Sequence, residues 1–228
     1  MTSGRRRAIV AASALGAAVL FLAGAADLQA CTLWAAAGER VAGGGSLIAK
    51  NRDWTPEPDE VRLVIPPQGF RHLGLFPVRA GKRPGPVAGV NEKGLAVVIA
   101  SAGSLPREVR AQGGKGLARQ LLSDFSTVEE VLAKRALFGR THPVFYLIAD
   151  GRRIAWIEVA PEGRYAVRET AAGLLSHTNH YREAPLLDAN RKIGRSSRAR
   201  LARIEELLAG RPQPLTREDF IAFSADRH

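Results

Sequence analysis

The stretch DLQACTLWAAA, residues 27–37, lies where a hydrophobic leader ends and the first expected strand begins, and it holds the chain's single cysteine, Cys31. A lone cysteine at such a junction can be a small buried residue, an attachment point for lipid, or the first residue of a processed protein. The apolar run that follows enters the folded domain at once. The interpretation of fold and function therefore depends on which of these three roles Cys31 has.

The residues before Cys31 have the parts of a secretory signal peptide. Three arginines at positions 5–7 precede an uncharged apolar run, residues 8–26, and Ala30 is a small residue suited to cleavage. We predict cleavage after residue 30, export to the bacterial periplasm or the extracellular space, and a mature domain of residues 31–228. A permanent membrane anchor is the alternative, because the apolar run approaches spanning length. The arginines leave general secretory and twin-arginine export both open.

The charge of the chain is strongly basic. The formal charge of +11 falls by three arginines and rises by one aspartate on cleavage, which leaves +9. Such an excess is typical of proteins that meet anionic partners. The basic residues are scattered, however, and no aromatic-rich basic motif accompanies them, so nucleic-acid binding is not predicted. A solvated basic surface is the better interpretation.

Hydrophobic patterning predicts an α+β protein in which blocks of antiparallel strands alternate with pairs of helices. The expected strands are residues 32–37, 46–51, 61–67, a hairpin over 86–101 that turns at Asn91, and 143–150, 153–161 and 163–169. The expected helices are residues 116–125, 128–139 behind a capping box of Ser126 and Glu129, 196–208 behind a serine cap, and a last segment that begins at Thr216.

A processed amino terminus at Cys31 would carry a nucleophile and a base on one residue. The α-amine titrates near ~7.7 to 8.0 and the thiol near ~8.5 before any perturbation. The amine can accept the thiol proton, directly or through water, and the thiolate can then attack a carbonyl to form a thioester. Such a site needs an anion beside the amine and donors for the oxyanion.

Four motifs in order resemble the cysteine N-terminal nucleophile hydrolases, the group of penicillin V acylase, choloylglycine (bile salt) hydrolase and isopenicillin-N acyltransferase. They are Cys31-Thr32, NRDW at 51–54, GVNEKGL at 89–95 and TNHY at 178–181. The NRDW and TNHY motifs favour the acyltransferase branch. The resemblance implies a four-layer αββα sandwich, with two antiparallel sheets between helical layers.

The resemblance also implies roles for individual residues. Cys31 would be the nucleophile, and Asp53 the carboxylate that binds its amine. Asn179 would be an oxyanion-hole donor, and Asn91 a second polar group over the site. No metal or organic cofactor is implied. The expected partner is a small N-acyl amide.

Two positions correspond to arginines of the choloylglycine enzymes, and the first departs from their pattern. Lys50 stands where those enzymes have an arginine, and neighbouring Arg52 is not an obvious replacement. Their later arginine matches Arg198 in SSRARL, or an equivalent in sequence beyond His228. Because no capping signal precedes His228, we also expect a domain that is incomplete at this end, with open sheet edges and low solubility.

Each candidate has a purely structural alternative. Asp53 can end a strand in an ordinary turn, and Asn91 opens a hairpin turn that favours asparagine in any case. Asn179 stands in a strand-like run, which is an unfavourable place for asparagine. His177 and His180 suggest a metal site, but a clear third ligand is missing, so no metal is predicted.

Lipidation of Cys31 is the rival hypothesis for its function. Leu28, Gln29 and Ala30 partly fit a bacterial lipobox. Lipid on the thiol and acylation of the amine would remove nucleophile and base together, and would leave an anchored binding protein. Lipoproteins usually continue with a polar tether, whereas this chain continues with TLWAAA. We therefore predict an exported amidase or acyltransferase that acts on a linear, non-peptide C–N bond.

Overall fold

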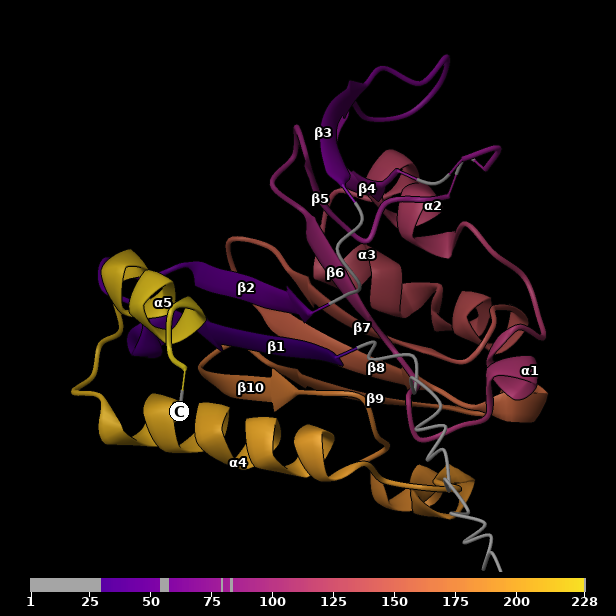
Figure 1. Cartoon of the computed structure of the whole chain (residues 1–228). Helices are drawn as coiled ribbons and strands as arrows, with labels where there is room; N and C mark the ends of the chain where they lie inside the picture. Colours follow the sequence, from indigo (N-terminus) through magenta and orange to yellow (C-terminus); the bar gives the residue numbers. More distant parts are fainter. Residues whose placement is uncertain (1–29, 54–57, 79, 83, 228) are drawn as a thin grey trace, which may run out of the picture.

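The computed structural model describes residues 30–53, 58–78, 80–82 and 84–227 (Figure 1). Of Asp53 it describes the backbone alone. Residues 1–29 of the predicted leader lie outside the described part of the chain, and Ala30 begins the first strand. Within the described residues, the chain forms two antiparallel sheets and two groups of helices.

The smaller sheet has the nucleophile candidate on its central strand. Strand β1 (Ala30–Ala37) pairs on one side with β2 (Ser46–Asp53) and on the other with β10 (Gly173–His177). Cys31 lies opposite Arg52 in this register. Residues 33–37 are therefore held on both sides by neighbouring strands, whereas Cys31 and Thr32 pair with β2 alone.

The larger sheet contains seven strands in sequence order, all antiparallel. Its strands are β3 (Asp59–Val64), β4 (His72–Pro77), β5 (Ala88–Asn91), β6 (Ala96–Ser101), β7 (Val144–Ala149), β8 (Ile154–Val159) and β9 (Tyr165–Thr170). Most of these strands were predicted from their alternating or apolar runs. Strand β4 was not, because glycine and proline surround its short apolar pattern.

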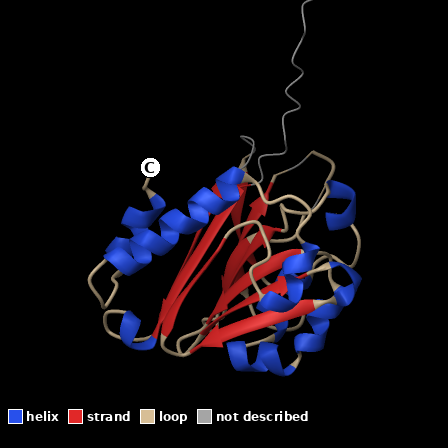
Figure 2. Ribbon diagram, turned by 90° about the horizontal axis from the view of Figure 1, so that it is seen from below, coloured by secondary structure: helices blue, strands red, loops and turns tan. Residues whose placement is uncertain are grey.

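The alternation of side chains on β1 explains how the layers stack. Leu33 and Ala35 face the core between the two sheets, whereas Trp34 and Ala36 face outward. Helices α4 (Arg195–Gly210) and α5 (Arg217–Ser224) cover that outer face. Figure 2 shows them on one side of the strands and the other helices on the opposite side.

The outer face of the larger sheet packs against α2 (Leu117–Asp124) and α3 (Val128–Ala133). Residues of β7 and β8 that point away from the inter-sheet core complete this second apolar layer. The order of layers is helix, sheet, sheet, helix. The predicted αββα sandwich is confirmed.

The helix predictions were less accurate at their ends. Residues 128–139 do not form one helix: α3 stops at Ala133 and a 3-10 helix, Arg135–Arg140, follows. The cap is Thr127, whose side chain accepts the Glu130 N–H, so the Ser126–Glu129 box is wrong by one residue. With the helix starting after Thr127, the Val128 side chain is buried against the sheet.

The remaining short helices were not predicted. They are α1 (Arg107–Arg110) and the 3-10 helices Gly38–Arg40, Pro161–Gly163 and Ala184–Ala189. Helix α4 has Gly194 at its N-cap instead of a serine, which leaves the Ser197 hydroxyl available for other partners. Thr216 caps α5 in a complete capping box with Asp219, at the position where the sequence predicted a new segment.

Candidate active site

Cys31 lies at the start of β1, on the face between the two sheets, and is only 5% exposed. Its backbone N–H donates to Oδ1 of Asn179 over 2.8 Å. These residues are far apart in sequence, and the pairing of β1 with β10 brings them together. The backbone nitrogen of Cys31 therefore has a fixed polar partner.

Asn179 is held in place by contacts on several sides. Its backbone N–H donates to Ser197 Oγ over 3.1 Å, and its carbonyl accepts the Ser104 N–H over 3.0 Å. Its Nδ2 donates to the Ser101 carbonyl over 2.9 Å. Asn179 follows β10 in a bend and not in a strand, so the strand-like interpretation of this run was wrong.

An arginine that the sequence analysis did not select completes this cluster. Arg200, on α4, donates to the Cys31 carbonyl, to Thr32 Oγ1 over 2.9 Å and to Asn179 Oδ1 over 3.0 Å. Its guanidinium thus ties the backbone of the cysteine to the amide of Asn179. Two donors on one oxygen also fix which way the Asn179 amide points.

Arg198, the arginine named from the sequence, is exposed on α4, and the structure does not bring it to this cluster. Helical phase does not separate the two arginines. At 100° per residue, Arg200 lies about 60° before Ser197 and Arg198 about 60° after Leu201, so they flank the buried face on opposite sides. The way α4 packs against β1 brings Arg200 to Cys31.

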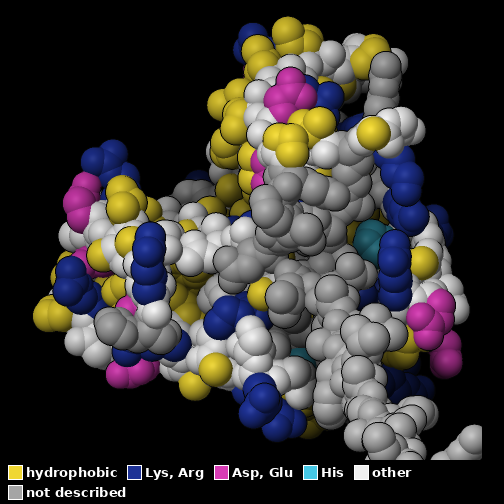
Figure 3. All heavy atoms as spheres, in the orientation of Figure 1, with side chains coloured by type: hydrophobic (Ala, Val, Ile, Leu, Met, Phe, Trp, Pro, Cys, Tyr) yellow, Lys and Arg dark blue, Asp and Glu magenta, His cyan; other side chains and the backbone are white. Residues whose placement is uncertain are grey.

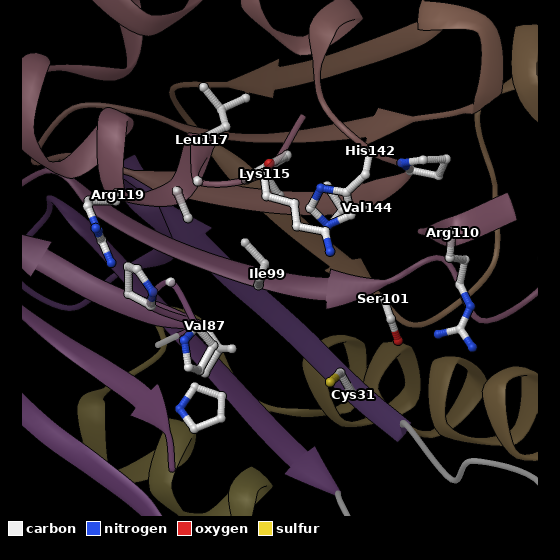
Figure 4. Close-up of a pocket in the computed structure, with 18 of the residues that line it drawn as sticks. Cys31, Val87, Ile99, Ser101, Arg110, Lys115, Leu117, Arg119, His142 and Val144 are labelled. Carbon is white, nitrogen blue, oxygen red and sulfur yellow. The ribbon is translucent and has the colours of Figure 1, made fainter. Parts of the chain in front are cut away.

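A cavity of about 520 Å³ opens beside Cys31 (Figure 4). Ser101, which also accepts from Asn179, forms part of its wall and was not predicted as a site residue. Apolar side chains line it as well, among them Val87, Ile99 and Val144. The nucleophile candidate therefore faces a space large enough for a small organic molecule.

Lys50 lines the same cavity from β2. Its Nζ donates to the Val87 carbonyl over 3.1 Å. Burial lowers the pKa of Lys50 to about 8, against the opposing effect of negative charge on Cys31. Lys50 and Cys31 thus line the same cavity.

The other two predicted residues have different surroundings. The backbone of Asp53 pairs with Ala30 at the end of β2, beside Cys31, while its side chain lies outside the described part of the chain. Asn91 does not line the cavity. Its Nδ2 donates to the carbonyls of Leu122 and Phe125 at the far end of α2.

The two hydrogen bonds that the Asn91 side chain accepts also stabilise the hairpin turn. Its Oδ1 accepts the N–H groups of Lys93 and Leu95, each over 3.0 Å. These bonds occupy the side chain fully, so the structure supports the turn-forming interpretation of Asn91. Ser101, at the end of the same hairpin, lies at the site instead.

His177 and His180 frame the Asn179 segment. His177 is buried between the Glu158 carboxylate, 2.8 Å from Nε2, and the Thr178 carbonyl. Burial lowers the pKa of His180 to about 4, which suits its contact with the Ser197 hydroxyl over 2.8 Å. Among the described residues, no three metal-ligating side chains gather into a group.

Helices long and apolar enough to cross a bilayer do not occur in the part of the chain that the structure describes. The longest helix there, α4, is amphipathic and buries one face.

Two solved structures have a similar arrangement. A variant of the conjugated bile acid hydrolase from Clostridium perfringens is 17% identical, with a TM-score of 0.48, over 70% of this chain and 56% of its own. The penicillin V acylase from Agrobacterium tumefaciens is 18% identical, with a TM-score of 0.44, over 86% of this chain and 62% of its own. The chain thus spans less than two thirds of either structure.

No curated protein sequence matches this chain. The family described as acyl-coenzyme A:6-aminopenicillanic acid acyl-transferase matches residues 41–228. This match covers most of the chain and includes three of the four motifs, while Cys31-Thr32 lies just before it. The chain belongs to this acyl-transferase family, among the N-terminal nucleophile hydrolases that its motifs predicted.

Proposed function

We propose that this protein is an exported enzyme that cleaves a linear, non-peptide amide, or transfers its acyl group, through a thioester on Cys31. The proposal rests on one observation. Asn179 and Arg200 both form hydrogen bonds with the backbone of Cys31 and with each other, at the edge of a cavity. A cysteine with a purely structural role does not require these hydrogen bonds. Membership of an acyl-transferase family supports the same chemistry.

Processing before Cys31 would convert its backbone nitrogen into an α-amine. That amine takes the thiol proton, and the thiolate attacks the carbonyl carbon of the substrate. A C–S bond forms, the C–N bond breaks, and the proton passes to the leaving amine. Water or an acceptor amine then attacks the thioester and restores the thiol.

The surrounding residues have distinct roles in this proposal. Asn179 orients the nitrogen of Cys31 through Oδ1, and its Nδ2 is the proposed donor to the oxyanion. Arg200 keeps both residues in register, and is the proposed site arginine in place of Arg198. Asp53 is the proposed partner of the α-amine, since its backbone adjoins Ala30.

Burial of the thiol weighs against lipidation. Cys31 belongs to a strand of the smaller sheet and is only 5% exposed, so a diacylglycerol group on Sγ would be held against the protein body and not extended towards a membrane. A lipid-anchored binding protein is therefore the weaker of the two hypotheses.

Intact mass and amino-terminal sequencing of the exported protein test the first step. We expect a chain that begins at Cys31 with a free α-amine. Activity is then measured on a panel of N-acyl substrates: penicillin V, bile-salt conjugates, acyl-homoserine lactones and N-acyl amino acids. Cys31→Ala should abolish turnover and leave the melting curve unchanged. A diacylglycerol adduct on Cys31 would rule out the enzyme and establish the lipoprotein.

A further inference from the structure

Glu158 is a buried carboxylate in a strand whose other side chains are apolar or aromatic. Strand β8 reads IAWIEV, and Glu158 is 0% exposed. It shares the inner face of the strand with Trp156, which belongs to the core between the two sheets. A buried ion pair is seldom more stable than apolar side chains of similar volume, because both charges leave water. Stability alone therefore does not account for a glutamate here, and the proposed reaction does not use its carboxylate.

The Glu158 carboxylate contacts both ends of the segment that contains Asn179. Its Oε1 lies 2.8 Å from Nε2 of His177, the last residue of β10, and accepts the Arg182 N–H over 2.7 Å. Its Oε2 accepts the Glu183 N–H over 3.2 Å. One side chain of the larger sheet thus closes the segment that follows the smaller sheet into a loop.

The peptide group that precedes the Asn179 side chain is held at both of its polar ends. The Thr178 carbonyl lies 2.9 Å from His177 Nδ1, which donates the hydrogen because a carbonyl oxygen can only accept. The N–H of the same peptide group, that of Asn179, donates to Ser197 Oγ over 3.1 Å. His177 therefore connects the Glu158 carboxylate to the backbone that aims the Asn179 amide.

We propose that Glu158 is a positioning residue: its carboxylate fixes the loop after β10 and so sets the place of the Asn179 amide beside Cys31. This role rests on the proposed function, which gives Asn179 its part in the reaction. The described lining of the cavity does not include Glu158, so the carboxylate acts through Asn179 and not on the substrate.

The Glu158→Gln variant tests this role with little change in volume. Its amide has a single acceptor oxygen, so it cannot satisfy the three nitrogen groups that surround the carboxylate. The assay uses the N-acyl substrate that the unsubstituted protein cleaves fastest, at a temperature where both proteins are folded. We expect kcat to fall about tenfold and KM to change by less than about twofold, because the displaced group is the oxyanion donor. An unchanged kcat would overturn the proposal.

Asp150→Asn is the matched control for the loss of a buried carboxylate. Asp150 is also buried, and its carboxylate accepts the backbone N–H groups of Val128, Arg152 and Arg153 over 2.7 to 3.0 Å. It follows β7 and lies outside the described lining of the cavity. Asp150→Asn should lower Tm and leave kcat unchanged. A loss of kcat equal to that in Glu158→Gln would mean that stability alone is responsible, and would overturn the positioning role.

Two replacements of His177 separate its two hydrogen bonds. The amide nitrogen of glutamine reaches about as far as Nε2, so His177→Gln keeps the contact with Glu158. The amide nitrogen of asparagine lies about where Nδ1 does, so His177→Asn keeps only the contact with the Thr178 carbonyl. We expect His177→Asn to lower kcat about tenfold and His177→Gln to lower it less. Equal losses, or the reverse order, would overturn the connection through Glu158.

Hydrogen exchange measures the loop independently of turnover. In Glu158→Gln the N–H groups of Arg182 and Glu183 lose their carboxylate partner, so residues 178–183 should exchange faster while β8 keeps its protection. Faster exchange there, in a protein that cleaves no substrate of the panel, would refute the proposed function and retain the role of Glu158. Normal turnover, with unchanged exchange and kcat in the variant, would retain the proposed function and overturn that role.

Discussion

Arg200 connects two residues that act on opposite sides of the proposed reaction centre. It holds the Cys31 carbonyl and the Asn179 amide oxygen with one planar guanidinium. Lysine cannot reproduce this geometry, because its ammonium is a single point of charge. One side chain of α4 therefore contributes to the alignment of the proposed nucleophile and the proposed oxyanion donor.

Replacement of Arg200 tests this dependence at the level of single residues. Arg200→Gln should lower kcat by about 10²-fold, since small misplacements in a reaction centre have effects of this size. Arg200→Lys should recover little of the kcat that Arg200→Gln loses. Arg198→Gln is the matched control on the same helix and should remain near normal. The reverse order of effects would return the catalytic role to Arg198.

Lys50 predicts a pH dependence. With its pKa lowered to about 8 by burial, the side chain is an ammonium below that pH and a neutral amine above it. The ammonium stabilises a nearby thiolate, so activity should decline as pH rises through about 8. Lys50→Arg keeps a permanent cation and should move this decline to higher pH. Identical kcat profiles for both proteins between pH ~6 and ~10 would exclude Lys50 as its cause.

At the level of elements, the site depends on two connections that meet. The segment after β6 contains Gly103, and the segment after β10 contains Asn179. A Cβ on Gly103 would lie 3.0 Å from the Asn179 Cβ, closer than ordinary packing allows. Glycine at this position lets the two segments approach, while the Ser104 N–H binds the Asn179 carbonyl.

Gly103→Ala should therefore displace Asn179 and lower kcat by roughly tenfold, with a smaller effect on KM. The control is Gly210→Ala, at the end of α4, where an added Cβ meets nothing within 4 Å. Steady-state kinetics and thermal melts of both variants separate loss of alignment from loss of stability. An unchanged kcat in Gly103→Ala would mean that Asn179 tolerates the displacement.

At the level of the whole molecule, one sheet edge presents apolar side chains to solvent. Val61 and Leu63 on β3 are 69% and 61% exposed. Leu63 pairs across the sheet with Leu73, which pairs with Val90. Figure 3 shows apolar side chains gathered over this part of the surface. Strand β3 is also the edge strand of its sheet in the described chain.

An exposed apolar edge favours association between copies. We expect the purified protein to self-associate as its concentration rises, as measured by sedimentation velocity. Leu63→Lys should suppress this, because a charge on the edge opposes strand pairing. Gln120→Lys adds the same charge on exposed α2 and should not. A protein that stays monomeric at high concentration would contradict the prediction.

Patterns that act over a few residues were readable in the chain itself. Alternating apolar residues identified most strands, the Thr216 cap identified the start of α5, and four short motifs identified the family. Cys31 was selected from its position behind the predicted leader. Each of these signals rests on neighbouring residues, whose chemistry does not depend on distant contacts.

Which of several similar side chains lies at the site is decided by the tertiary structure. The sequence does not distinguish Arg200 from Arg198, and only the packing of α4 against β1 brings Arg200 to Cys31. Asn91 matched a motif, yet its side chain is used by the turn and by α2, while Ser101 lies at the cavity. The pairing of β1 with β10 joins Cys31 to Asn179. Such contacts join residues remote in sequence, so no local pattern records them.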